Sequence, residues 1–215
     1  MRIYIIRHGE TEANAKGILQ GWADYPLNEY GEHLAVVTGQ KLSNVQFDAA
    51  FSSPLRRAYK TCELILKNSG NDLTHINIDD RLKEINAGEW EGKQFGKESK
   101  ELPPEKLRLF YDDTFAFGGF PGGETISELC DRTQNFLREI GRNRQYSTVL
   151  VSTHGCAMRA MLNFIYENKR DFWHGHVPKN CAVNIVETDG VKFNLIGDDL
   201  IYYESLDCID IRHHR

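Results

Sequence analysis

The sequence predicts an α/β fold, a three-layer sandwich with a mostly parallel central sheet flanked by helices. Two observations predict it. Apolar, β-rich segments alternate with segments of helical periodicity along the 215 residues. Two of those apolar segments, residues 3–6 and 148–153, are followed by His8 and His154. Because ligands of such folds bind beyond the carboxyl ends of the strands, we expect both histidines to lie at the binding site.

The first half of the chain continues this alternation after the N-terminal strand. Apolar spacing over residues 34–45 predicts a helix, and residues 47–51 read as a second short strand. Ser53 is a favourable N-cap, and Pro54 suits the first helical position. We therefore expect a second helix to begin here, with Arg57 in its first turn.

Periodicity breaks down over residues 91–123, where Pro-Pro, Gly-Gly and Pro-Gly-Gly sequences interrupt the chain. We interpret this stretch as an inserted, partly irregular cap with short helices. The cap is rich in aromatic residues: Phe95, Phe110, Tyr111, Phe115, Phe117 and Phe120. Such a cluster favours a small satellite core over a substrate slot.

The second half of the chain adds two helices and a hairpin. Thr125 and Glu128 form a capping-box pattern that predicts the start of a helix of about 18 residues. Apolar spacing over residues 158–165 predicts another helix, directly after His154. Residues 182–187 and 191–196, separated by an Asp-Gly pair, read as a closing hairpin.

Composition bounds the class of protein. The length favours one domain over residues 1–215. With 40% hydrophobic and 27% charged residues, the chain lies outside the composition range of disordered proteins. A net charge of -5 and a pI near 5.9 argue against nucleic acid or an anionic membrane as a partner. A small anionic ligand stays possible, because the charge of a pocket is local.

Cysteine and histidine spacing bears on compartment and metal. The five cysteines contain no C-x-x-C pair, which fits neither a disulfide framework nor a zinc knuckle: Cys62, Cys130, Cys156, Cys181 and Cys208. The apolar run before Arg7 is too short for a signal peptide, so we expect a soluble, cytoplasmic protein. Two close histidine pairs, His174 with His176 and His213 with His214, lack further ligands at metal spacing. We expect no metal site.

Four motifs follow in order along the predicted elements. They read Arg7-His8-Gly9-Glu10-Thr11-Glu12 with Asn14 and Gln20-Gly21-Trp22; Ser52-Ser53-Pro54-Leu55-Arg56-Arg57-Ala58; Leu82-Lys83-Glu84 with Gly88-Glu89-Trp90-Glu91-Gly92; and Ser152-Thr153-His154-Gly155. Together they resemble the histidine phosphatase superfamily, which includes cofactor-dependent phosphoglycerate mutases. A lone Arg-His-Gly tripeptide would be weak, but four ordered motifs spanning nearly the whole chain are a specific signal.

The resemblance implies roles for particular residues. It implies that His8 is the nucleophile that becomes phosphohistidine and that Glu84 is the general acid. It places other positions at the bound phosphate or substrate: Asn14, Gln20, Gly21 and Gly155. Glu124, in a Pro-Gly-Gly-Glu-Thr sequence, resembles a motif of phosphatase-like members, which makes it a further substrate-binding candidate. An acidic residue there also suits the start of a helix, so the role of Glu124 stays open.

The same residue types suit phosphoryl transfer on chemical grounds. A phosphomonoester dianion needs cationic donors on its oxygens, an in-line nucleophile and an acid for the departing alkoxide. The guanidiniums of Arg7 and Arg57 match phosphate oxygens, and they disfavour a charge on His8, whose imidazole attacks only when neutral. His154 then serves as a phosphate donor. Such a cluster of positive charge predicts that phosphate or sulfate binds in the site.

These inferences predict a phosphomonoester hydrolase that acts through phosphohistidine on a small phosphorylated metabolite, without metal or cofactor. The alternative is a phosphoglycerate mutase that depends on 2,3-bisphosphoglycerate, although the Arg-Arg-Ser segment and proline run of such mutases are not found here. A catalytically inactive module that binds phospho-ligands is a third, weaker candidate. Basic residues in the cap leave an acidic substrate open: Lys93, Lys97, Lys100, Lys106 and Arg108.

Overall fold

The computed structural model describes residues 1–72, 75–96 and 99–203. Within these residues, one six-stranded sheet has the order β3-β2-β4-β1-β5-β6. The strands are β1 Arg2–Arg7, β2 Ala49–Ser52, β3 Asn77–Ile78, β4 Thr148–Thr153, β5 Val183–Thr188 and β6 Phe193–Leu200. The first four run parallel to one another, and β5 and β6 form the antiparallel closing hairpin. The predicted α/β class with a mostly parallel sheet is confirmed.

The register of β1 and β4 positions the two motif histidines. These strands pair in parallel, with Arg7 opposite Thr153, and both lie in the middle of the sheet. His8 and His154 are the residues that follow the two strands. They therefore leave the sheet side by side at its carboxyl edge, as the strand-then-histidine pattern predicted.

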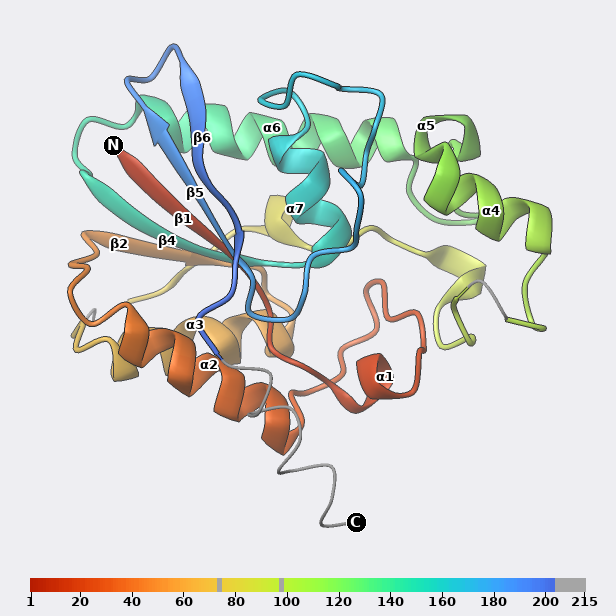
Figure 1. Cartoon of the computed structure of the whole chain (residues 1–215), viewed down its shortest axis with the longest axis horizontal. Coiled ribbons are helices and arrows are strands. Elements are labelled where there is room, and N and C mark those ends of the chain that lie inside the picture. Colours follow the sequence, from red (N-terminus) through yellow and green to blue (C-terminus); the bar gives the residue numbers. More distant parts are fainter. Residues whose placement is uncertain (73–74, 97–98, 204–215) are drawn as a thin grey trace.

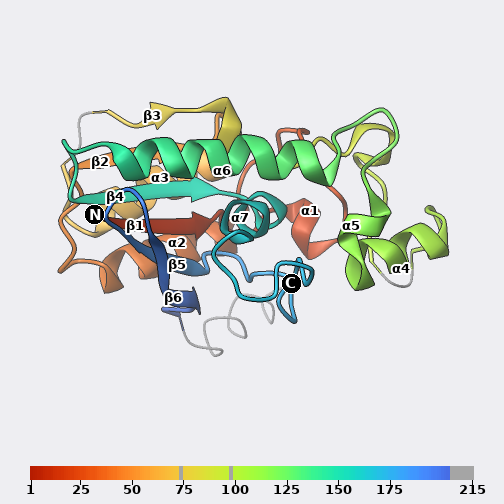
Figure 2. The same cartoon turned by 90° about the horizontal axis from the view of Figure 1, so that it is seen from above.

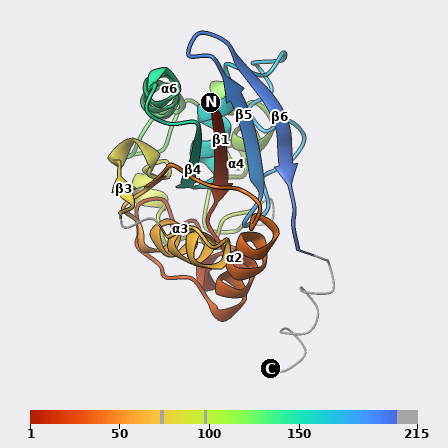
Figure 3. The same ribbon diagram turned by 90° about the vertical axis from the view of Figure 1, so that its left-hand side faces the viewer.

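Helices cover both faces of the sheet, and others lie past the carboxyl ends of its parallel strands (Figure 1). They are α1 Glu12–Ala15, α2 Glu29–Lys41, α3 Arg56–Asn68, α4 Pro104–Asp112, α5 Thr114–Phe117, α6 Ile126–Arg142 and α7 Gly155–Leu162, with 3-10 turns η1 at Asp80–Leu82 and η2 at Gly88–Trp90. The sheet lies between α2 and α3 on one side and α6 on the other (Figure 3). This arrangement is the predicted three-layer sandwich.

Alternation along β1 builds both halves of the core. Tyr4 and Ile6 pack into the cluster beneath α2 and α3, whereas Ile3 and Ile5 pack into the cluster beneath α6 and α7. A strand that is apolar on both faces is stable only when helices cover both faces. The continuously apolar sequence of this strand therefore follows from its central place in the sheet.

The cap lies past the end of the sheet. Figure 2 shows α4 and α5 beyond the end of β1 and β4, next to the start of α6. The remainder of the insertion is irregular, as the broken periodicity of residues 91–123 predicted. Its aromatic residues join the start of α6 and α7 in one apolar cluster. This position places the cap over the edge from which His8 and His154 emerge.

Helix starts were predicted with mixed success. The capping box is present: Oγ1 of Thr125 accepts from the backbone N–H of Glu128, and α6 has 17 residues. The N-cap assigned to Ser53 is wrong, because α3 begins at Arg56 with Leu55 at its N-cap position. Pro54 therefore precedes the helix as well, and the Ser53 hydroxyl bonds to His154 at 2.8 Å while it accepts from the N–H of Leu55 at 3.3 Å. Arg57 does lie in the first turn of α3, as expected.

The described residues cover only part of the predictions for the cysteines and the histidine pairs. The cysteines in the described ranges, Cys62, Cys130, Cys156 and Cys181, are free thiols, and Cys208 lies outside those ranges. His213 and His214 also lie outside them. Nowhere in the described part of the chain is a helix both long enough and apolar enough to cross a membrane.

Candidate active site

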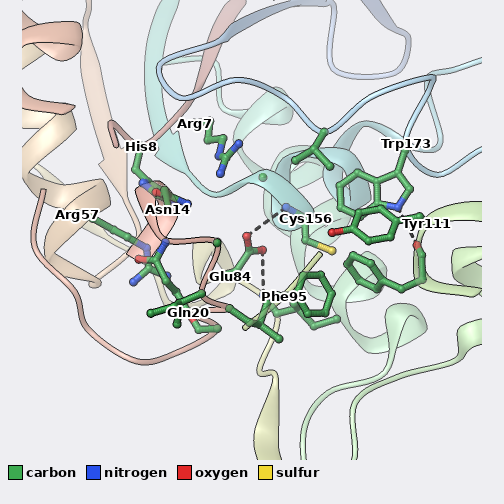
Figure 4. A pocket seen from close by; sticks show the side chains of 18 residues that line it. Arg7, His8, Asn14, Gln20, Arg57, Glu84, Phe95, Tyr111, Cys156 and Trp173 are labelled. Atoms are coloured by element: carbon green, nitrogen blue, oxygen red, sulfur yellow. Dashed lines mark hydrogen bonds between the residues drawn. The ribbon is translucent and has the colours of Figure 1, made fainter. Parts of the chain in front are cut away.

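A pocket with a volume of about 180 Å³ opens at the carboxyl edge of the sheet (Figure 4). Residues of all four motifs line it, together with residues of the cap and of the loop before β5. The lining includes most of the predicted site: Arg7, His8, Asn14, Gln20, Gly21, Arg57, Glu84 and Gly155. Segments far apart in the sequence, from Arg7 to Val177, thus supply one concave surface.

His8 is held as a neutral base. Its side chain is 3% exposed, and Nδ1 lies 2.6 Å from the carbonyl oxygen of Gly9. Burial, followed by the charges of Arg57 and Arg7, lowers the pKa of His8 well below its usual value. In the neutral ring, a proton on Nδ1 is donated to the Gly9 carbonyl, which leaves the lone pair on Nε2. This is the tautomer that an imidazole nucleophile needs.

Arg57 is fixed by the loop that carries the first motif. Its Nη1 and Nη2 each donate over 2.8 Å, to the carbonyl oxygens of Ala23 and Gly21. Burial lowers the pKa of Arg57 to about 10, so the guanidinium stays charged near neutral pH. Gly21 has a φ of +52°, and a Cβ there would lie 2.3 Å from Oε1 of Glu91. The loop can therefore reach Arg57 in this conformation because position 21 is glycine.

Arg7 approaches the pocket from the end of β1. Its Nη1 donates to the carbonyl oxygen of Pro178, and burial lowers its pKa. The Nε atoms of both Arg7 and Arg57 are buried and have no partner among the described residues. A buried cationic N–H without an acceptor is costly. Both guanidiniums therefore have unused donor capacity for an anion in the pocket.

His154 lies behind His8 rather than on the pocket surface. The two ring centroids are 5.1 Å apart, and His154 is fully buried. Its Nε2 is 2.8 Å from the hydroxyl oxygen of Ser53, whereas Nδ1 has no partner in the part of the chain that is described. Burial is the main cause that lowers its pKa well below the usual value, and the charge of Arg57 adds to it. The structure thus brings His154 to the nucleophile, and its predicted role as a phosphate donor stays a prediction.

The carboxyl group of Glu84 lies at the N-terminal end of α7. Its Oε1 accepts from the backbone N–H groups of Ile85 at 3.0 Å and Ala157 at 2.9 Å, and its Oε2 accepts from Cys156 at 3.2 Å. Backbone N–H groups in the first turn of a helix lack partners within the helix, which suits them to a carboxylate. The dashed lines in Figure 4 mark two of these bonds and show Glu84 between the arginines and the cap.

The remaining first-motif residues line the pocket wall. Oδ1 of Asn14 accepts from the backbone N–H and the hydroxyl of Thr11, at 3.2 and 3.0 Å. Using the oxygen in this way leaves the amide nitrogen as a donor toward the pocket. Gln20 is buried in the wall, and Gly155 faces Arg7, whose Nε would lie 3.3 Å from a Cβ at that position.

Glu124 is not among the residues that line the pocket, and its assignment to the substrate stays a prediction. Its two carboxylate oxygens accept from Nε and Nη2 of Arg132, at 2.6 and 2.8 Å. Oε2 also accepts from the backbone N–H of Asn86 at 3.2 Å. In this structure the Glu124 carboxylate is thus held by the guanidinium fork of Arg132 and by the main chain.

Aromatic side chains form the other half of the pocket: Phe95, Phe110, Tyr111 and Trp173. The cap aromatics therefore serve both as a satellite core and as a pocket wall. Phe117 and Phe120 are buried within the cluster, whereas Phe115 is 41% exposed and contacts Phe172. In the described ranges, no group of three or more histidine, cysteine or acidic side chains is placed to hold a metal ion.

Several supporting residues gave no usable signal in the sequence. Asn180, from the loop before β5, donates to the carbonyl oxygens of His8 at 3.0 Å and Gly9 at 3.1 Å. Trp173 joins the pocket wall although it lies outside the cap sequence. Arg132 lies in the middle of a helix and resembles an ordinary solvent-facing arginine in the sequence. Ser53 and His154, by contrast, both belong to motifs that the sequence showed.

Comparison with known proteins agrees with this geometry. The family profile described as "Histidine phosphatase superfamily (branch 1)" matches residues 3–197. The chain belongs to the histidine phosphatase superfamily. "Phosphoserine phosphatase 1" of Hydrogenobacter thermophilus is 33% identical over 161 residues, which cover 75% of this chain and 74% of that protein. "Probable phosphoglycerate mutase GpmB" of Salmonella choleraesuis is 33% identical over 165 residues, which cover 77% and 74%.

A solved structure with the same fold extends the match. "Bacillus stearothermophilus YhfR" superposes with a TM-score of 0.85 and 29% identity, covering 94% of this chain and 99% of that one. The expected family and the expected enzyme class, a phosphatase of the histidine type, are thereby confirmed. Relatives named as mutases also occur, so the alternative has support from names as well.

Proposed function

We propose that this protein hydrolyses small phosphomonoesters whose leaving group has an apolar, flat surface. The observation that carries the proposal is the division of the pocket. A neutral imidazole and two partly unsatisfied guanidiniums, from His8, Arg7 and Arg57, lie at one end, and aromatic rings form the other. Such a pocket has one place for a phosphate and an apolar surface for the group that departs.

The first step transfers the phosphoryl group to the protein. The lone pair on Nε2 of His8 attacks phosphorus, and the bond between phosphorus and the ester oxygen breaks. The carboxyl group of Glu84 gives its proton to the departing oxygen, which leaves as an alcohol. Arg7 and Arg57 stabilise the charge on the equatorial phosphoryl oxygens. The products of this step are the alcohol, phosphohistidine and a Glu84 carboxylate.

The second step releases phosphate. A water molecule enters where the alcohol was, and the Glu84 carboxylate takes its proton as the water oxygen attacks phosphorus. The P–N bond breaks, and its electron pair returns to Nε2 of His8. Inorganic phosphate leaves, and both side chains regain their starting protonation. The three backbone N–H groups on Glu84 hold the carboxylate in place for this step.

The charge distribution in the pocket disfavours the mutase alternative. A mutase must bind a second anionic group of its bisphosphate or phosphoglycerate, which calls for further cationic donors. Among the described residues, the arginines and lysines that line the pocket are Arg7 and Arg57 alone. The described basic residues of the cap, Lys93, Lys100, Lys106 and Arg108, are not part of the lining, and Lys97 lies outside the described ranges.

We propose further that turnover needs neither a metal nor a cofactor, because the arginines supply the positive charge. 2,3-bisphosphoglycerate would be needed by the mutase alternative alone. Inorganic phosphate or sulfate is expected to bind at Arg7 and Arg57 in the absence of substrate. The free thiols of the described cysteines favour a cytoplasmic location, where thiols stay reduced.

A substrate panel tests the proposal. Phosphate release is measured with aryl, alkyl, sugar and carboxylate-bearing phosphomonoesters, with and without 2,3-bisphosphoglycerate and with a chelator. We expect phosphate release without additions and higher kcat/KM for aromatic leaving groups than for carboxylate-bearing ones. Interconversion of phosphoglycerates without phosphate release, dependent on the bisphosphate, would instead establish the mutase.

A further inference from the structure

Arg132 makes an unusual set of contacts outside the pocket. It projects from α6 with 18% of its side chain exposed, and all five N–H bonds of its guanidinium have acceptors. Glu124 accepts two of them. The other three go to main-chain carbonyl oxygens, those of Arg81 at 2.8 Å, Lys83 at 2.7 Å and Glu84 at 2.9 Å. One side chain thus holds three carbonyl groups of a single short segment.

That segment has little regular structure of its own. It begins within the 3-10 turn η1, which ends at Leu82, and no helix or strand includes residues 83–87. Glu124 forms two hydrogen bonds with Asn86, near the C-terminal end of the segment. The Glu124 carboxylate accepts from the N–H of Asn86, and the Glu124 N–H donates to the Asn86 carbonyl oxygen at 2.9 Å. Tertiary hydrogen bonds rather than secondary structure therefore hold the backbone on both sides of Glu84. Most of them come from Arg132 and Glu124, and one more is donated by Nε1 of Trp22 to the Glu84 carbonyl oxygen at 2.8 Å.

We propose that Arg132 and Glu124 are positioning residues that set the direction of the Glu84 carboxyl group. This inference rests on the proposed function, in which Glu84 moves the proton. Its side chain bonds to the start of α7, and its carbonyl oxygen bonds to Arg132 of α6. Glu84 is thereby held between α6 and α7, and the direction in which its carboxyl group points into the pocket depends on the hydrogen bonds to both helices.

A purely stabilising role explains these contacts less well. Largely buried ion pairs are weak evidence for stability, because the desolvation of both charges offsets their attraction. The planar fork of arginine is what reaches a carboxylate and three carbonyls at once. Lysine keeps the charge but has three donors on a single nitrogen, so it cannot reproduce that geometry. An Arg132→Lys substitution therefore separates the geometry from the charge.

The test compares two leaving groups. Because a good leaving group needs no proton, loss of the acid slows an alkyl phosphate far more than 4-nitrophenyl phosphate. We expect Glu84→Gln to show this contrast most strongly. Arg132→Lys should lower kcat about 10- to 100-fold with the alkyl phosphate, and several-fold less with the aryl one. Glu124→Gln should change both rates in the same pattern, and inhibition by inorganic phosphate should be unchanged in both variants.

Arg138→Lys is the matched control. Arg138 lies on the same helix, where it bonds to Gln134 and stacks over Phe164, and it makes no contact with the Glu84 segment. This variant should behave as wild type with both substrates. Thermal unfolding of each variant establishes that it is folded, and Glu124→Gln carries the test if Arg132→Lys is not.

The outcomes separate two kinds of failure. Equal slowing of both substrates by Arg132→Lys and Glu124→Gln, while Glu84→Gln shows the contrast, overturns the positioning role and leaves the proposed function intact. A changed inhibition constant for phosphate would instead assign Arg132 and Glu124 to the phosphate site, and this result would also overturn the positioning role. If Glu84→Gln itself shows no contrast, the assignment of the acid fails, and the positioning role fails with it.

Discussion

The two halves of the pocket are built by different means. In the polar half, hydrogen bonds to the main chain hold the reactive side chains: Arg57 on two carbonyls, His8 on the carbonyl of Gly9, and Glu84 on three N–H groups. In the aromatic half, rings pack edge to face, with the Phe95 and Phe110 centroids 5.1 Å apart. One hydrogen bond, from Nε1 of Trp173 to the carbonyl oxygen of Phe110, links the cap to the loop before β5.

This difference separates chemistry from selectivity. A side chain fixed by main-chain hydrogen bonds leaves unsatisfied buried groups when it moves, so its geometry is sharply defined. Packed rings can adjust to a new neighbour at lower cost, because no polar group loses its partner. We therefore expect loss of the nucleophile or of an arginine in the polar half to impair every substrate alike, and loss of the acid Glu84 to impair poor leaving groups most. Changes in the aromatic half should alter the ratio between substrates according to the shape of the leaving group.

The strongest test of the polar half is His8→Asn, which removes the nucleophile. We expect kcat to fall by about 10⁴-fold for every phosphomonoester, aryl and alkyl alike, because no other described side chain on the pocket surface is a neutral imidazole. Steady-state kinetics over the substrate panel measures this. In wild type, brief exposure to labelled substrate should give an acid-labile, base-stable label that is absent from the variant.

A label that persists in His8→Asn would place the nucleophile elsewhere, with His154 as the next candidate. A loss confined to some substrates would contradict the division of the pocket, since it would mean that the polar half also selects among leaving groups.

The aromatic half is tested by Phe95→Leu. Phe95 is partly buried, lines the pocket and contacts Phe110. Shortening its ring should change the kcat/KM ratio of aromatic to small alkyl substrates by about 10- to 200-fold, which corresponds to about 1–3 kcal/mol. Phe115→Leu is the matched control, because Phe115 belongs to the same cap, is 41% exposed and does not line the pocket.

We expect the control to leave the ratio unchanged. If Phe95→Leu slows all substrates by one common factor, the ring serves folding of the cap, and the aromatic wall has no part in selection.

Prediction from the sequence also differed between the polar and the aromatic half of the pocket. The polar half comes from short motifs at the ends of predicted strands and helices, and their resemblance to the histidine phosphatase superfamily placed His8, Arg57 and Glu84 in one pocket. Local reasoning failed where a tertiary contact competed. Ser53 is a residue type that favours N-caps, but its hydroxyl lies 2.8 Å from His154, which follows β4, and it accepts from the N–H of Leu55 over a longer 3.3 Å; α3 begins later, at Arg56.

The supporting residues were out of reach for a related reason. Asn180, Arg132 and Trp173 act through contacts with segments 40 or more positions away, and nothing in their immediate sequence marks them. The sequence singled out Glu124 but did not show that Arg132, two helical turns later, lies against it. Side-chain direction depends on packing, which short motifs do not encode.

The last and smallest effect concerns the charge state of the polar half. The pKa values of His8 and His154 are lowered well below 6.5, so both rings are neutral in the folded protein. Unfolding exposes them, and below pH 6.5 the unfolded chain binds protons that the folded protein does not. Stability is then independent of these groups above pH 6.5 and falls as the pH drops toward their lowered pKa values. Each histidine contributes a loss of about 1.4 kcal/mol per pH unit in that window.

His8→Asn removes one of these groups, so its free energy of unfolding should fall less than that of wild type between pH 7 and pH 5.5, by about 1 kcal/mol. Urea unfolding at several pH values measures the difference. The exposed His75 gives the control, since His75→Asn removes a ring that is in solvent in both states and should leave the wild-type pH dependence unchanged. Equal slopes for His8→Asn and wild type would mean that folding does not lower the pKa of His8, so that below pH 6.5 the ring would be an imidazolium, which cannot attack phosphorus. The stability measurement thus tests, without any substrate, the one property of the polar half on which the whole mechanism depends.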